Sequence, residues 1–261
     1  MLILNEEKYA QAVYDGTNTD IKTVMPKIRY VTRYLLHTAK KSDEENYQLT
    51  VEWLKKYHDN FDESYYSNLI SDAITKAYKC PFYSLDGIKI TKTELEIIAS
   101  LDNLRAEKVL FVLLCMAKHQ SISNGFTNGL VKYSMTELCK TARISVPAED
   151  REYILYDIIQ HGYLGYPKKN NTQCLIVNFI DTADDVALIL DEEDCKELAY
   201  VYLRWKNNGK GYTKCQKCNK LIKQSKTKPK KYCEDCAKEV LVEQKRLWAE
   251  KSRKNLTQQN D

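Results

Sequence analysis

The sequence Cys215-Gln-Lys-Cys218, followed fourteen residues later by Cys233-Glu-Asp-Cys236, decides how the C-terminal part of this chain folds. Two Cys-x2-Cys pairs at this separation supply four thiolates, the number of ligands in a tetrahedral zinc site. Four protein ligands leave no position for water or substrate, so the site is predicted to be structural. We therefore expect one structural Zn²⁺ bound by these four cysteines.

The residues around the pairs predict a small finger at residues 212–254. Asn219 directly follows the first pair, and asparagine tolerates the positive φ that such a turn requires. Residues 221–231 have room for a short hairpin, and a helix is predicted from about residue 234 to 251. A turn, a hairpin and a helix that carries the last two ligands resemble a treble-clef or zinc-ribbon finger. Few apolar residues surround it, so we expect it to unfold without metal.

Two other uses of the cysteines stay open. A Cys-x2-Cys pair can be a redox centre, although the chain lacks the βαβ pattern of thioredoxin-like proteins. Four thiolates can also bind an iron–sulfur cluster, although the spacing differs from the ferredoxin pattern. The remaining cysteines are scattered singly and are predicted to be buried free thiols: Cys80, Cys115, Cys139, Cys174 and Cys195.

The net charge of +4 hides a strong asymmetry along the chain. Residues 206–261 contain sixteen Lys or Arg against six Asp or Glu, whereas residues 1–205 contain 24 against 30. No acidic residue occurs between Lys206 and Lys231. A basic tail on an acidic body predicts a polyanionic partner for the tail, and nucleic acid, DNA in preference to RNA, is the partner we expect.

The lysines of the tail are the candidate phosphate ligands, and Tyr232 or Trp248 is a candidate for stacking on a base. The candidate contacts are Lys223, Lys226, Lys228, Lys230, Lys231, Lys245 and Arg246, with Lys168 and Lys169 as further candidates in a turn of the middle region.

Residues 1–80 predict a domain of three or four amphipathic helices. Ser42 and Glu45 have the spacing of a capping box that opens one of them. No apolar run reaches the length of a membrane span, and the first four residues are too short for a signal peptide. We therefore expect a protein of the cytoplasm of a bacterial host cell, with no membrane partner.

Residues 91–206 predict a second domain, which opens with a capping box at Thr91 and Glu94 and continues into a buried helix around residues 109–114. A third box at Ser134 and Glu137 opens a helix to residue 142. A turn, a second helix over residues 147–161 that ends at Gly162, and a hairpin over residues 163–179 follow. This order resembles the winged helix-turn-helix domains of bacterial and phage regulators and replication proteins.

The second helix of this motif has an unfavourable charge for reading DNA. It carries four acids against Arg151 alone, and Lys168, Lys169 and Arg143 offset them only in part. The domain therefore serves as a scaffold or protein-interaction module in our interpretation. A helix is predicted from Glu192 to Lys206, with Asp191 as its cap. We interpret the acids of residues 181–194 as the solvated start of this helix rather than as a divalent-metal site.

The fold class predicted is mainly α: a helical domain, a winged-helix-like middle with a small hairpin, and a four-cysteine finger with a basic helix. This layout and the Lys-Lys-Tyr-Cys-x-x-Cys segment (residues 230–236) resemble proteins of phages and mobile elements in Gram-positive bacteria, a likeness that brings no established activity. We expect a non-enzymatic regulator of transcription or replication. The alternative is an inhibitor or adaptor that docks on a host nucleic-acid enzyme.

Overall fold

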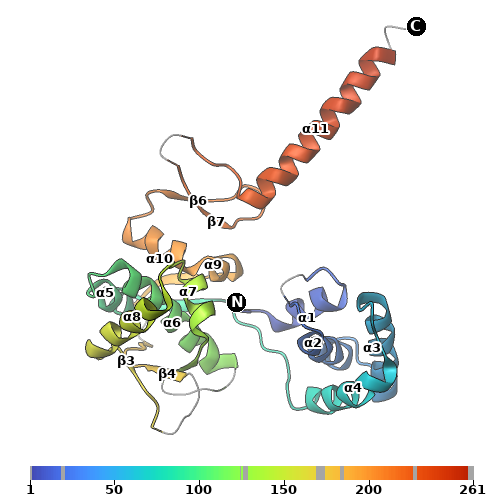
Figure 1. The fold of residues 1–261 in the computed structure, drawn as a ribbon, viewed down its shortest axis with the longest axis horizontal. Coiled ribbons are helices and arrows are strands. Elements are labelled where there is room, and N and C mark those ends of the chain that lie inside the picture. Colours follow the sequence, from blue (N-terminus) through green and yellow to red (C-terminus); the bar gives the residue numbers. More distant parts are fainter. Residues whose placement is uncertain are drawn as a thin grey trace. The chain divides into compact units, whose positions relative to one another are not determined.

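A computed structural model describes residues 2–18, 21–123, 125, 129–168, 174–182, 185–225 and 228–257, with side chains as far as residue 249. These residues are mainly helical and contain small antiparallel sheets (Figure 1). The chain divides into two compact units. The N-terminal unit is Ile3–Asp86, and the C-terminal unit is Gly87–Asp261 with Met1–Leu2.

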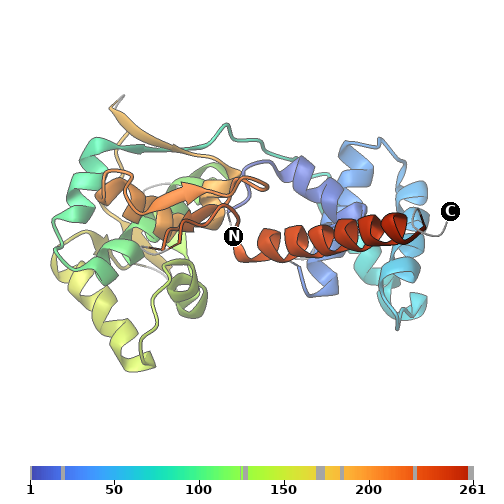
Figure 2. The same cartoon turned by 90° about the horizontal axis from the view of Figure 1, so that it is seen from above.

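The described residues of the N-terminal unit form four helices, where the sequence predicts three or four. They are α1 (Glu6–Tyr14), α2 (Val24–His37), α3 (Asp43–Tyr57) and α4 (Glu63–Ala77). Ser42 and Glu45 form the predicted capping box, in which each side chain bonds the backbone N–H of the other residue. Figure 2 gives a second view of the four helices.

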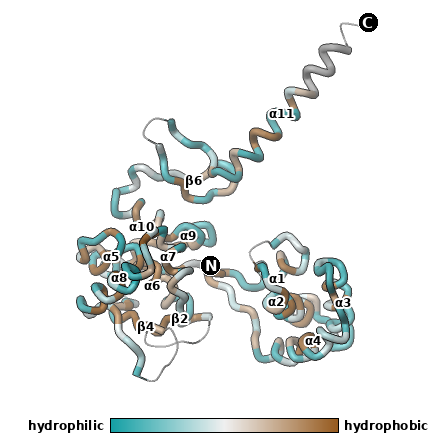
Figure 3. Tube along the Cα trace, in the orientation of Figure 1, coloured by the Kyte–Doolittle hydropathy of each residue, from teal (hydrophilic) through white to brown (hydrophobic). Residues whose placement is uncertain are grey.

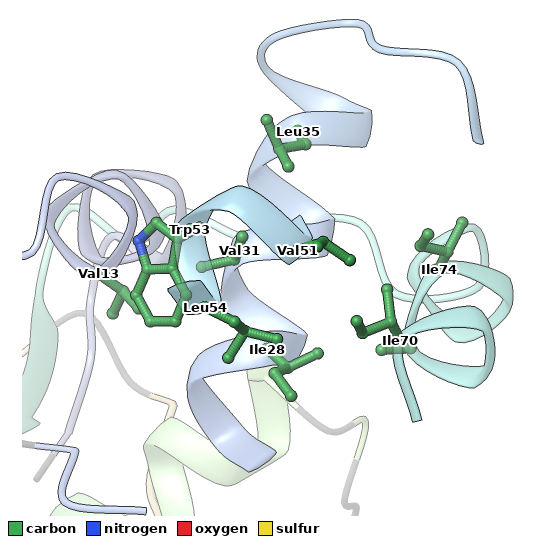
Figure 4. Close-up of a cluster of buried hydrophobic side chains, with 10 residues drawn as sticks. Val13, Ile28, Val31, Leu35, Val51, Trp53, Leu54, Ile70 and Ile74 are labelled. Atoms are coloured by element: carbon green, nitrogen blue, oxygen red, sulfur yellow. The ribbon is translucent and has the colours of Figure 1, made fainter. Parts of the chain in front are cut away.

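Apolar side chains from all four helices form the core of the N-terminal unit (Figure 4). Ile28, Val31 and Leu35 lie on one face of α2 and are at most 1 % exposed. Trp53 packs among them and donates from its indole N–H to the carbonyl of Tyr14, at 2.7 Å. This unit is therefore a helical bundle around α2.

The C-terminal unit contains the remaining elements. Its strands are β1 (Ile88–Thr91), β2 (Leu130–Lys132), β3 (Leu164–Gly165), β4 (Cys174–Val177), β5 (Val186–Leu190), β6 (Tyr212–Lys214) and β7 (Leu221–Lys223). Its helices are α5 (Lys92–Ala99), α6 (Leu104–Ser123), α7 (Met135–Thr141), α8 (Ala148–Gln160), α9 (Glu192–Lys196), α10 (Leu198–Lys206) and α11 (Glu234–Thr257). The described strands form three antiparallel sheets, with the orders β1-β5, β2-β4-β3 and β6-β7.

Helix α6 is the centre of the C-terminal unit, and Figure 3 colours much of it as hydrophobic. Every residue from 109 to 115 is at most 2 % exposed, which confirms the predicted buried helix. Helices α5, α7, α8 and α10 and strands β1, β2 and β4 contact it. Among the described residues, no helix has both the length and the apolar character needed to cross a membrane.

The region after α6 follows the predicted order of helix, turn, helix and hairpin. Gly162 adopts a φ of +78° just beyond α8, as predicted, and β3 pairs antiparallel with β4. The prediction of a third capping box, at Ser134 and Glu137, is wrong. Ser134 precedes α7 in an extended conformation, but its side chain accepts no cap hydrogen bond, so α7 begins without that stabilisation.

The prediction of a single helix from Glu192 to Lys206, capped by Asp191, is wrong in its length. Asp191 caps α9 as predicted, by accepting from the N–H of Asp194 at 2.7 Å. The helical path then breaks at Glu197, with φ −132° and ψ 39°, and resumes as α10. At this break the Glu197 carboxylate is bonded by cationic groups from two other segments, an arrangement that sequence periodicity does not encode.

Candidate metal centre

The hairpin β6-β7 presents the first cysteine pair. The two strands pair antiparallel, with Lys214 opposite Leu221, so that residues 215–220 form the turn between them. The N–H of Cys215 donates to the carbonyl of Lys220 at 2.9 Å, and Asn219 has the predicted positive φ, +57°. The hairpin predicted within residues 221–231 is therefore wrong: the strands flank the first pair, because the turn itself contains the two cysteines.

The start of α11 presents the second pair, as predicted. Cys233 lies just before the helix, and Cys236 lies in its first turn. The four sulfur atoms of Cys215, Cys218, Cys233 and Cys236 all lie within 4.8 Å of one another. Three of the four residues are buried, and Cys218 is half-buried. We call these four residues the cysteine cluster.

The cluster favours a cation on electrostatic grounds. Burial disfavours ionisation of Cys215, but the backbone N–H groups of Cys218, Cys233 and Lys217 outweigh it and lower the pKa of the thiol to about 6. Burial and the neighbouring sulfurs raise the pKa of Cys236 and of Cys218. One thiolate thus forms readily while its neighbours resist a second negative charge, and a divalent cation removes that penalty.

The donor set is consistent with one structural metal site such as Zn²⁺. Four thiolates complete a tetrahedral shell, and no position remains for a substrate. The sulfur atoms of Cys218 and Cys233 are 3.7 Å apart, far beyond a disulfide bond of about 2.05 Å. Among the described residues, no second group of His, Cys, Asp or Glu is arranged to hold a metal.

Ion pairs attach the finger to the rest of the C-terminal unit. The Glu197 carboxylate, 3 % exposed, accepts from Arg143 at 2.5 Å and from Lys220 at 3.2 Å. Lys214 of β6 pairs with Asp191 at 3.3 Å. Arg143 also stacks on Tyr200, with its guanidinium carbon 4.3 Å from the ring centre. Some lysines of the basic tail are therefore neutralised by acids of the body.

The candidate phosphate contacts differ from these paired lysines. The following five are exposed and have no carboxylate within ion-pairing distance among the residues that the structure describes: Lys223, Lys228, Lys230, Lys231 and Lys245. Arg246 pairs with Glu243 at 2.9 Å on α11. Lys168 is exposed after β3, and Lys169 and Lys226 lie outside the described residues.

Sequence reasoning missed two cations beside these lysines, Arg105 and Lys108. Both lie at the start of α6, where Arg105 is exposed and Lys108 donates to the carbonyl of Arg143 at 2.9 Å. Their distance from the tail in the sequence, and the acidic balance of residues 1–205, hid them. No signal in the sequence alone places them next to β7.

The prediction for the other cysteines is confirmed for Cys115, Cys139, Cys174 and Cys195, which are buried free thiols. It is wrong for Cys80, which is exposed. Cys80 follows α4 and precedes Pro81, so it stands in the link that leaves the helical core.

Comparison with known proteins finds no family model that matches the chain, and no curated protein or solved structure that is significantly similar to it.

Proposed function

We propose that this chain is a zinc-stabilised nucleic-acid-binding protein without enzymatic activity, which acts as a regulator of transcription or replication in a phage or mobile element. The observation that carries the proposal is the set of unpaired lysines on the finger. Surface lysines near carboxylates normally form pairs, as Lys214 and Lys217 do here at 3.3 and 2.6 Å. An exposed group without such partners retains its full charge for phosphate groups.

The metal gives this surface its shape in our proposal. Residues 224–232 join β7 to the second cysteine pair, so zinc fixes both ends of the segment that carries Lys228, Lys230 and Lys231. The side-chain amide of Gln224 links the two ends of this segment. It donates to the carbonyl of Lys230 at 3.0 Å and accepts from the backbone N–H of Lys230 at 2.8 Å. Lysines on a fixed loop lose less conformational entropy on binding than lysines on a disordered tail.

The element order α6, β2, α7, α8, β3, β4 supports a winged helix-turn-helix as the body beside the finger. In that arrangement α8 would be the recognition helix. Its exposed residues include Glu149, Asp150 and Glu152, which would repel phosphates. We therefore assign phosphate contact to the finger and no DNA-reading role to α8.

A salt titration of binding to labelled duplex and single-stranded DNA tests the proposal. We expect log Kd to depend linearly on log salt concentration, because bound lysines release counterions. The variant K228Q/K230Q/K231Q should lower the slope by roughly 0.9 for each lost contact, or about 2.7 in all on duplex DNA. The matched control K22Q/K40Q/K79Q, in the N-terminal unit, should leave the slope unchanged.

Affinity weaker than millimolar at low salt for both DNA and RNA would rule the proposal out. Equal slopes for the loop variant and the wild type, with zinc content and circular dichroism preserved, would show that the contact surface lies elsewhere.

The second candidate function is an adaptor or inhibitor that docks on a host nucleic-acid enzyme. The observation that favours it is the outer face of α8, where Tyr153 and Tyr156 are 71 % and 61 % exposed among the acids. Exposed tyrosines are common at the centres of protein interfaces. A pull-down from the host with and without nuclease separates the two: a partner lost on nuclease treatment supports nucleic-acid binding, and one retained supports docking.

A further inference from the structure

A cavity lies in the C-terminal unit where the finger meets α10. Its volume is ≈ 180 Å³, and its walls include Arg143, Tyr200, Lys220, Lys223 and Lys230. Lys220 ends the turn before β7, Lys223 is on β7 and Lys230 is in the loop after it, whereas Arg143 comes from the turn between α7 and α8. Cations from segments eighty residues apart in the chain therefore face one space.

The cationic cluster extends beyond the cavity to the start of α6. Burial, followed by the charges of Arg105, Arg143 and Lys223, lowers the pKa of Lys108. Lys108 also holds the turn by donating to the carbonyl of Arg143 at 2.9 Å. The neighbouring charges that lower the pKa of Lys108 are all cations, and their repulsion of its ammonium group is unfavourable to the folded state.

The carboxylates of the cavity neutralise Arg143 but leave Arg105 and Lys223 without an acidic partner among the described residues. Glu197 is buried, and its carboxylate forms ion pairs with Arg143 and Lys220 rather than with Arg105, Lys108 or Lys223. Glu234 and Asp235 lie in the first turn of α11, where the helix dipole favours acids. Arg105 and Lys223 are exposed, and the described residues place no carboxylate within ion-pairing distance of either.

We propose that Arg105, Lys108, Arg143 and Lys223 form a phosphate-binding junction, through which the backbone of a bound nucleic acid passes from the finger onto the body. This inference rests on the proposed function and deepens it, because it assigns phosphate contacts to the body as well as the tail. Anion binding relieves the repulsion that Arg105 and Lys223 exert on Lys108. Arg105 and Lys223, which have no acidic partner among the described residues, offer donors to phosphate oxygens.

The junction should bind a phosphodiester chain rather than a free phosphate. Arg105 lies on α6 outside the cavity, whereas Lys223 and Lys230 lie on the finger and line it, so the cations are spread over separate segments rather than gathered in one closed pocket. Successive phosphates of one strand can contact cations on these separate segments, whereas inorganic phosphate meets only one or two cations. A nucleic-acid strand therefore gains binding free energy from several phosphate contacts at once, which inorganic phosphate cannot do.

The test is a salt titration of DNA binding by the full zinc-loaded chain carrying R105Q/K223Q. We expect the slope to fall by about 1.8, for two lost phosphate contacts on duplex DNA. The control K22Q/R29Q removes the same residue types from the N-terminal unit and should keep the wild-type slope. The charge-retaining variant R105K/K223R should also keep it, which separates charge from folding.

The results separate this inference from the proposed function. If the wild type fails to bind DNA or RNA at low salt, both fall. If K228Q/K230Q/K231Q lowers the slope and R105Q/K223Q matches its control, the junction is wrong and the tail assignment survives. If millimolar inorganic phosphate or a mononucleotide competes with DNA at the junction as well as an oligonucleotide does, the polymer assignment is overturned.

Discussion

At the scale of single residues, the local partner decides what each charged or sulfur-bearing group can do. Lys220 and Lys223 lie three positions apart, yet Lys220 bonds the buried Glu197 at 3.2 Å while Lys223 is exposed and unpaired among the described residues. The sequence predicts a run of equivalent lysines. The path of the backbone through β7 directs Lys220 toward Glu197 and leaves Lys223 exposed. Lys220 therefore has a structural role, and Lys223 remains available for phosphate.

The cysteines give a residue-scale prediction about thiol reactivity. Burial, with Asp194 and Asp191, raises the pKa of Cys195 to about 12, and burial raises that of Cys115. These thiols hold almost no thiolate at pH 8, and a metal ion bound by the cysteine cluster would protect its four sulfur atoms. Native protein should therefore show one fast thiol, Cys80, in a titration with a thiol reagent.

Chelation of the metal should raise the number of reactive thiols from one to five, because the cysteine cluster is then released. The variant C80S should lower both numbers by one. Five fast thiols before any chelator is added would contradict the predicted metal site.

At the scale of elements, the break between α9 and α10 is the feature that joins the finger to the body. Glu197 interrupts an otherwise helical segment and accepts from Arg143 of the α7–α8 turn and Lys220 of the finger. Its substitution E197Q should lower the local free energy of opening of β6 and β7 by roughly 1–3 kcal/mol, because two cations lose a charged acceptor. Amide hydrogen exchange in the hairpin measures this energy.

The matched control for that prediction is E193Q on the neighbouring helix. Glu193 pairs with Lys196 at 2.7 Å on the surface, where such a pair contributes less than about 1 kcal/mol. Hairpin amides should exchange at the wild-type rate in this variant. If E197Q and E193Q behave alike, Glu197 does not hold the finger.

Elements with local signals were predictable from the sequence, and elements with distant partners were not. The capping boxes at Ser42 and Thr91, the buried run in α6 and the positive φ of Asn219 depend on neighbours a few residues away. The hairpin around the first cysteine pair depends on pairing across the turn. The break at Glu197 depends on Arg143, 54 residues away, which periodicity cannot reveal.

At the scale of the whole molecule, the charge of a sequence segment does not show which of its cations remain without an acidic partner in the fold. The sequence divides into an acidic body and a basic tail, with balances of −6 and +10. In the folded C-terminal unit, acids of the body neutralise Lys214 and Lys220 of the tail, and Arg105 of the body and Lys223 of the tail both lie near Lys108. The proposed nucleic-acid surface is therefore shared by segments that lie far apart in sequence.

The proposed nucleic-acid surface depends on a bound metal, because the four sulfur atoms join the hairpin β6-β7 to α11 on either side of the segment that carries the lysines. X-ray absorption at the zinc edge, on protein purified under reducing conditions and quantified for metal, tests this most directly. We predict one zinc per chain with four sulfur ligands at about 2.3 Å. Substoichiometric zinc, a shell with nitrogen or oxygen ligands, or iron in its place would contradict the account.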